Sequence, residues 1–139
     1  MLPLKDPSLL KNSCYLEGSW INADHNGTIG VTNPATGENI GTVPKMGAPE
    51  TRRAIAAASI ALPAWRAKTA KERSAILKRW FDLIMANQDD LAVIMTAEQG
   101  KPLAEAGLYV VIVGQLLVTL GGQGQRKDYQ QCISHGIND

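Results

Sequence analysis

Residues 69–106 read TAKERSAILKRWFDLIMANQDDLAVIMTAEQGKPLAEA, and this stretch decides the fold class. Thr69 and Glu72 have the spacing of a capping box, in which a hydroxyl and a carboxylate bind the first free amides of a helix. Apolar residues then recur at helical spacing and predict one apolar stripe, made of Ile76, Leu77, Trp80, Phe81 and Ile84. We therefore predict an amphipathic helix that begins near Thr69.

Two more helices are predicted directly after this one. Asn87 or Gln88 suits the N-cap of the next helix, whose inner face would carry Leu91, Ile94 and Met95. Gly100 predicts the end of that helix and Pro102 the start of another. The EQGKP motif of residues 98–102 is therefore typical of a structural helix junction.

Another helix is predicted upstream, over residues 49–62. Pro49 and Glu50 suit a first helical turn, and Pro63 predicts the end of the helix because proline lacks a backbone N–H group. Apolar and small residues follow the helical period between them, at Ile55, Ser59 and Leu62.

The chain before residue 49 has the pattern of short strands. Residues 15–21 alternate apolar and polar side chains across Glu17 and Gly18, which predicts a hairpin. Residues 28–32 and 38–43 are two further extended runs, separated by a turn at residues 33–37. The fold class expected is α/β, with short N-terminal β-strands followed by three or four α-helices.

The composition shifts after Ala106. Residues 108–120 form an apolar, β-branched run that predicts an added strand or an irregular helix. We divide the chain into an N-terminal tail at residues 1–13, a main segment at residues 14–106 and a divergent segment at residues 107–139.

Length and composition restrict the class of protein. The chain has 139 residues, 45% of them hydrophobic, which suits one globular domain or a piece of one. The formal net charge of +1 gives no basic excess for nucleic acid. The apolar run is too short for a membrane helix, no secretory signal is recognised at the N-terminus, and two distant cysteines favour a reducing compartment. We expect a cytoplasmic protein.

Four motifs together resemble a known family. They are YLEGSW at residues 15–20, VTNPATGENIGTVPKMG at residues 31–47, ERSAILKRWFDLI at residues 72–84 and EQGKPLAEA at residues 98–106. Their order and spacing resemble the amino-terminal portion of the aldehyde dehydrogenase superfamily, most closely the succinate-semialdehyde dehydrogenase branch. The resemblance covers about residues 15–106, which correspond to roughly the first fifth of a family member.

The resemblance implies NAD(P)-dependent oxidation of an aldehyde to an acid. In the family a cysteine thiolate attacks the carbonyl, hydride passes to the nicotinamide, and a glutamate activates water to hydrolyse the thioester. All these groups and the cofactor-binding glycines lie downstream of the segment that matches. We therefore assign no catalytic, cofactor-binding or metal residue here, and expect no cofactor on this chain, although the intact family binds NAD or NADP.

Residues 119–132 offer two faint similarities to that chemistry. Cys132 follows Gln131, but lacks the loop that surrounds the nucleophile of the family. Thr119 precedes Leu120 and two glycines, where the family has its glutamate base, and threonine cannot act as that base. We interpret both as incidental.

The sequence motifs for binding a dinucleotide or a metal ion are also weak. Gly122 and Gly124 follow an apolar run, but Lys127 stands where a dinucleotide turn needs a third glycine. Cys132 and His135 are spaced like half a metal site, which Cys14 and His25 would have to complete from the other end. We interpret His25 instead as a solvent-facing loop residue.

The aromatic residues Trp65, Trp80 and Phe81 favour a core role. A stacking surface for nucleotides would need a basic groove around them, whereas aromatic residues at helical spacing usually pack inside.

Two hypotheses of function follow. The first is a truncated protein of the aldehyde dehydrogenase family, inactive as this chain alone, whose change of pattern after Ala106 arises from a frameshift, deletion or gene-boundary error. The second is a non-catalytic module that docks onto an intact dehydrogenase or self-associates through the apolar faces of its helices.

Overall fold

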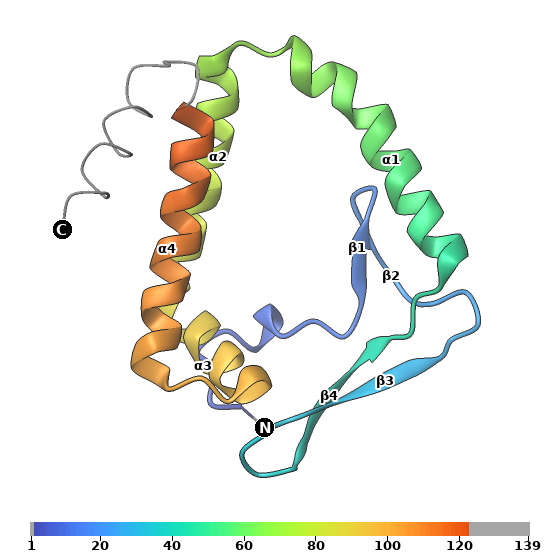
Figure 1. The fold of residues 1–139 in the computed structure, drawn as a ribbon, viewed down its shortest axis with the longest axis vertical. Coiled ribbons are helices and arrows are strands. Elements are labelled where there is room, and N and C mark those ends of the chain that lie inside the picture. The colour runs from blue at the N-terminus through green and yellow to red at the C-terminus, as the bar shows by residue number, and fades with distance from the viewer. Residues whose placement is uncertain (1, 123–139) are drawn as a thin grey trace, which may run out of the picture.

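The computed structural model describes residues 2–122. Figure 1 shows two hairpins followed by helices, with α2 and α4 side by side and α1 standing apart from them. The elements are the 3-10 helix η1 (Pro7–Leu9), strands β1 (Cys14–Leu16), β2 (Ser19–Ile21), β3 (Thr28–Thr32) and β4 (Asn39–Pro44), and helices α1 (Ala48–Ala67), α2 (Ala70–Ala86), α3 (Gln88–Gln99) and α4 (Leu103–Gly122). The predicted order of short strands and then helices is confirmed.

The strands form two separate antiparallel hairpins. Strand β1 pairs with β2 so that Tyr15 lies opposite Trp20, and the turn uses positive φ angles of 50° at Glu17 and 81° at Gly18. Strand β3 pairs with β4 from Thr28 opposite Pro44 onward. Both hairpins lie where the alternating sequence predicts them, and β4 is shifted by one residue from its predicted bounds.

Helix α1 extends further than the sequence predicts. The predicted end at Pro63 is wrong, because the helix continues through this proline to Ala67. Proline removes one intrahelical bond, to the carbonyl of Ser59. Ser59 and Pro63 are both exposed, so water can bind that carbonyl, and the helix tolerates the loss in its last turns.

Helix α2 begins at the predicted capping box. The Thr69 hydroxyl accepts from the Glu72 amide at 3.3 Å, and the Glu72 carboxylate accepts from the Thr69 amide at 2.7 Å. The predicted apolar stripe lies on this helix, but only one flank of it is covered. Leu77, Phe81 and Ile84 are partly buried, whereas Ile76 and Trp80 are 46% and 55% exposed.

The predicted helix junction is confirmed. Gly100 ends α3 with a φ of 70°, and its amide donates to the Thr96 carbonyl at 2.9 Å. The Pro102 carbonyl accepts from the Ala106 amide at 2.9 Å, so the proline stands directly before α4. The apolar run after Ala106 is helical rather than a strand.

Within residues 2–122 the core is small and lies mostly on α3 and α4, with one buried residue, Ala23, in the loop between β2 and β3. Its buried apolar residues are Ala23, Ala92, Ala97, Ala106 and Val110. Helix α4 packs on α2 at Gly114, where a Cβ atom would lie 2.9 Å from the Phe81 ring. Within residues 2–122, none of the helices has the length and apolar content needed to cross a membrane.

Candidate functional site

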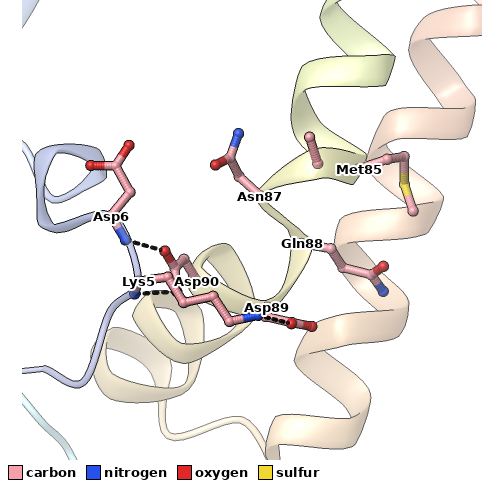
Figure 2. A pocket seen from close by; sticks show the side chains of 8 residues that line it. Lys5, Asp6, Met85, Asn87, Gln88, Asp89 and Asp90 are labelled. Carbon is pink, nitrogen blue, oxygen red and sulfur yellow. Dashed lines mark hydrogen bonds and ion pairs between the residues drawn. The ribbon is translucent and has the colours of Figure 1, made fainter.

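The most buried acidic side chain of α3 holds the N-terminal segment. Asp90 is only 5% exposed, and its two carboxylate oxygens accept from the backbone amides of Lys5 at 2.9 Å and Asp6 at 2.8 Å. Figure 2 shows the segment lying against the start of α3 through these two bonds. Asp90 thus ties the N-terminal segment, residues 2–13, to the helical part of the protein at Lys5 and Asp6.

An exposed ion pair lies beside this contact. The Lys5 ammonium lies 2.7 Å from the Asp89 carboxylate (Figure 2). The hydrogen bond between them is the main reason that the pKa of Lys5 is raised and that of Asp89 is lowered. Because both side chains are largely exposed, solvent screens the pair and it adds little to stability.

A shallow depression surrounds these groups. It is lined by Lys5, Asp6, Met85, Ala86, Asn87, Gln88, Asp89 and Asp90. Its side-chain amides bind the protein itself, since Asn87 donates to the Leu83 carbonyl and Gln88 to the Gly107 carbonyl. With its carboxylates also engaged, the depression acts as a structural junction between the N-terminal segment, α3 and α4.

A second acidic cluster positions the start of α1. Glu50 is 5% exposed and accepts from the amides of Asp24 and Gly47, each at 3.0 Å. These backbone hydrogen bonds, that from Asp24 first, lower the pKa of Glu50. Arg53 donates to both Asp24 oxygens at 2.7 Å, which lowers the pKa of Asp24. The cluster ties the loop between β2 and β3 to α1.

Replacing Glu50 by glutamine is expected to change how stability depends on pH. The folded state lowers the pKa of Glu50 below its ordinary 4.5, so the stability that this carboxylate contributes is present above pH 4.5 and is lost as pH falls through the lowered pKa. The variant should therefore be less stable at pH 7, and the difference from the wild type should shrink in acid.

Thermal unfolding between pH 3 and pH 7, followed by circular dichroism, measures this difference. The control Glu98→Gln removes the same charge from an exposed position at the end of α3 and should change stability by less than about 0.5 kcal/mol. A difference between Glu50→Gln and wild type that stays constant over this range would contradict the assigned role of Glu50.

The helix N-termini offer poor sites for a dinucleotide phosphate. A free helix N-terminus binds anions through its exposed amides and its dipole. Within residues 2–122 every α-helix already carries an acidic residue in its first turn, namely Glu50, Glu72, Asp89 with Asp90, and Glu105. These four helix N-termini are therefore poor candidates for binding the phosphates of NAD(P).

The structure describes two of the four residues that the metal interpretation would need, namely Cys14 and His25. Cys14 is a free, partly buried thiol in β1, and His25 is exposed in the loop after β2, as predicted. No three side chains of metal-binding type gather in the part of the chain that the structure describes. Cys132 and His135 lie outside the described residues, so the metal interpretation is not tested by the structure.

The remaining C-terminal candidates also lie beyond the described side chains. Gly124, Lys127 and Cys132 are outside residues 2–122. Gly122 ends α4, and Thr119 belongs to the backbone of the same helix. The interpretations of Thr119 and Cys132 as incidental stay predictions.

The core role predicted for the three aromatic residues is only partly right. Phe81 lies against α4 at Gly114, and Trp65 is partly buried. Trp80 is 55% exposed, so its core assignment is wrong. Helical spacing alone does not tell which flank of a stripe meets a neighbour, and here only the Leu77 and Phe81 side of α2 does.

Sequence reasoning missed the outer face of α4. This face carries five apolar side chains that are each about half exposed, namely Leu108, Tyr109, Ile112, Val113 and Leu116. The signal was present, because a helix with as few polar side chains as residues 108–116 is expected to be covered on most of its sides.

Comparisons with known proteins agree with the motifs. The sequence profile described as "Aldehyde dehydrogenase family" matches residues 20–136. A glutarate-semialdehyde dehydrogenase of Pseudomonas putida is 68% identical over 105 residues, which are 76% of this chain and 22% of that protein. The NADP(+) succinate-semialdehyde dehydrogenase of Escherichia coli is 50% identical over 125 residues, which are 90% of this chain and 26% of that protein.

Solved structures share the fold. The aldehyde dehydrogenase of Brucella melitensis biovar abortus superposes with a TM-score of 0.87 at 53% identity, over 91% of this chain and 26% of that one. The succinate-semialdehyde dehydrogenase of Burkholderia pseudomallei gives a TM-score of 0.85 at 56% identity, over 89% of this chain and 26% of that one. The chain thus spans about a quarter of the length of the relatives that it matches.

Proposed function

Because this chain belongs to the aldehyde dehydrogenase family, we propose that it supplies the amino-terminal scaffold of an NAD(P)-dependent dehydrogenase for dicarboxylic acid semialdehydes. The observation that carries the proposal is its identity of 68% and 50% to two semialdehyde dehydrogenases. The substrate class is an aldehyde with a carboxylate at its other end, because the glutarate and succinate compounds share that chemistry.

The role of the described residues is to build and fix the scaffold. Asp90 ties the N-terminal segment to α3, and Glu50 ties the β2–β3 loop to α1. Together these contacts hold the hairpins and helices in the arrangement that superposes on the relatives. The resemblance assigns the nucleophile, the base and the dinucleotide site to the remaining three quarters of a family member, so we propose that this chain alone does not catalyse the reaction.

A replacement experiment tests the scaffold role. In the Escherichia coli relative, the segment that corresponds to residues 15–106 is exchanged for these residues. The exchanged protein should fold and oxidise succinate semialdehyde with NADP+, measured as NADPH absorbance, while the 139-residue chain alone should give only the background rate. A folded exchange protein without activity would contradict the scaffold role, and turnover by the chain alone would contradict its lack of catalysis.

A further inference from the structure

The loop between β2 and β3 contains an asparagine followed by a glycine. Asn26 precedes Gly27, and no other asparagine of the sequence is followed by glycine. Asn26 is exposed, and its φ angle of 56° lies in the left-handed region that asparagine tolerates better than most residues. Gly27 lies before the first residue of β3, so the peptide bond between the two residues belongs to no helix or strand.

An asparagine side chain can react with the backbone nitrogen that follows it. The Gly27 nitrogen gives up its proton and attacks the side-chain carbonyl carbon of Asn26, which closes a five-membered succinimide. The bond from that carbon to the side-chain nitrogen breaks, and ammonia leaves with the proton. Water then opens the ring. Opening at the side-chain carbonyl gives aspartate, whereas opening at the main-chain carbonyl gives isoaspartate, and nothing is oxidised or reduced in either case.

We propose that Asn26 is a modification site, at which the folded protein converts this asparagine into aspartate and isoaspartate with water as the co-reactant. Glycine favours the reaction because it has no Cβ atom to crowd the closing ring and its backbone turns freely. The exposure of Asn26 gives water access to the site. The reaction is independent of the function proposed above.

The neighbouring asparagines differ from Asn26 in the residue that follows them. Asn33 is followed by proline, which has no backbone N–H group to act as the nucleophile. Asn39 is followed by isoleucine, whose branched side chain crowds the backbone nitrogen. Asn12 and Asn22 are followed by serine and alanine, which both carry a Cβ atom. We therefore expect the reaction at Asn26 and not at these four residues.

The contacts of the loop control how fast the reaction proceeds. The Asn26 amide donates to the carbonyl of the buried Ala23 at 2.8 Å, and the Glu50 carboxylate accepts from the Asp24 amide at 3.0 Å. These bonds hold the loop beside the start of α1 (Figure 1). Ring closure changes the backbone at Asn26, so the loop must open locally before it reacts. The unfolded chain should therefore react faster than the folded protein, and a variant with a looser loop should lie between them.

The product alters the loop in two ways. It adds one negative charge to a chain whose formal net charge is +1, in a loop that already carries the Asp24 carboxylate. Isoaspartate also adds one carbon atom to the backbone between the Asn26 amide and the Gly27 carbonyl. Both groups make hydrogen bonds of 2.8 Å, the second with the Lys45 amide, so the longer backbone disturbs them. We expect the modified loop to be held less firmly against α1.

Ageing of the purified protein tests the proposal. The full 139-residue chain, with its fold checked by circular dichroism, is kept in mildly alkaline buffer made with 18O-labelled water and then digested with trypsin. Residues 12–45 form one tryptic peptide that contains five asparagines, so mass spectrometry compares them in one molecule. Asn26 should gain labelled acid at least about ten times faster than the other four, because only its ring closure is uncrowded.

Two matched variants connect the rate to the fold. Glu50→Gln weakens the hold on the Asp24 amide and should raise the rate at Asn26 about fivefold, the factor that corresponds to one hydrogen bond. Glu98→Gln removes the same charge from an exposed position of α3 and should leave the rate unchanged. Equal rates in these two variants would contradict control of the reaction by the loop contacts.

Two further variants differ in how clearly they can be interpreted. Asn26→Ser removes the reacting side chain and should abolish the acidic form at this position. Gly27→Ala is a poor control, because its Cβ atom would lie 2.5 Å from His25 Nε2 and displace the imidazole ring. A loss of reaction in that variant would mix a crowded ring closure with a rearranged loop.

The results that would overturn the proposal are specific. Labelled acid at Asn26 in the urea-unfolded chain but not in the folded chain would show that the fold protects this residue, and equal rates at Asn26 and Asn22 would show that the site is not selective. If the isolated chain does not stay folded, the same mapping is done on the exchange protein described above, which contains residues 15–106. Labelled acid at Asn26 of that folded protein supports the proposal, and its absence overturns it, whether or not the protein oxidises succinate semialdehyde.

Discussion

Replacing Gly114 by valine is expected to lower the free energy of unfolding by about 3 kcal/mol, since overpacking a close helix contact displaces both elements. A Cβ atom at this position would lie 2.9 Å from Phe81 Cδ2, 3.2 Å from Phe81 Cε2 and 3.7 Å from Ile84 Cγ2. The Phe81 ring is held between α2 and α4, so it cannot turn aside as the end of a long flexible side chain could. The helices must separate, and the contact that joins α2 to α4 is the one disturbed.

Urea unfolding followed by far-UV circular dichroism measures the loss. Ala104→Val is the matched control, since it adds a β-branched residue to an exposed position of α4 and should cost only about 0.5 kcal/mol of helix propensity. Phe81→Leu should reduce the cost of Gly114→Val in the double variant, because the smaller side chain leaves room for the new methyl groups. Additive effects of the two substitutions would show that the ring is not what excludes the larger side chain.

Signals that act within a few residues made much of the fold predictable. The Thr69 and Glu72 pair, the positive-φ glycine at the end of α3 and the alternating hairpin strands each determine their own local structure. Pro63 shows the limit of this reasoning. Its intrinsic preference ends a helix, but an exposed site near the helix terminus lets water replace the lost bond, and the helix continues to Ala67.

The sequence predicts less well which face of each helix is buried. The spacing of Ile76, Leu77, Trp80 and Phe81 is helical, but it does not say which part of the stripe meets α4. That choice depends on Gly114, 33 positions beyond Phe81, whose missing side chain admits the ring. Trp80 is left half exposed on the other flank for the same reason.

The division of the chain after Ala106 stays a prediction. Helix α4 runs across this boundary, from Leu103 to Gly122, and the family profile matches as far as residue 136. The apolar run that suggested the division forms part of one helix, and its apolar side chains lie on both the buried and the exposed face of that helix. Sequencing the gene and the DNA that follows it tests the frameshift hypothesis, because remaining dehydrogenase sequence in another frame is its direct consequence.

The contact of Asp90 with the N-terminal segment was not predictable, since it joins residues 84 and 85 positions apart. In the sequence, the acidic pair at Asp89 and Asp90 looks like an ordinary first turn of a helix, where carboxylates favour the dipole. Only the folded chain shows that one of the pair is buried and binds two distant backbone amides.

Replacing Asp90 by alanine is expected to lower the free energy of unfolding by about 3 kcal/mol. The carboxylate accepts two hydrogen bonds, and each bond to a charged acceptor is worth about 1.5 kcal/mol or more when the donor is left without a partner. The amides of Lys5 and Asp6 would lose their acceptors in a partly buried place, and the N-terminal segment would detach from α3.

Two measurements distinguish this effect from a general loss of charge. Asp89→Ala removes the neighbouring carboxylate, whose partner is the exposed Lys5 ammonium, and should change stability much less than Asp90→Ala. Hydrogen exchange at the amides of Lys5 and Asp6 should become fast in Asp90→Ala and stay slow in Asp89→Ala. Equal destabilisation by the two variants, or slow exchange in Asp90→Ala, would mean that the N-terminal segment is held by other contacts. The burial of Asp90 argues for the larger loss in Asp90→Ala, because its carboxylate is only 5% exposed and water has little access to replace it as the acceptor of the two amides.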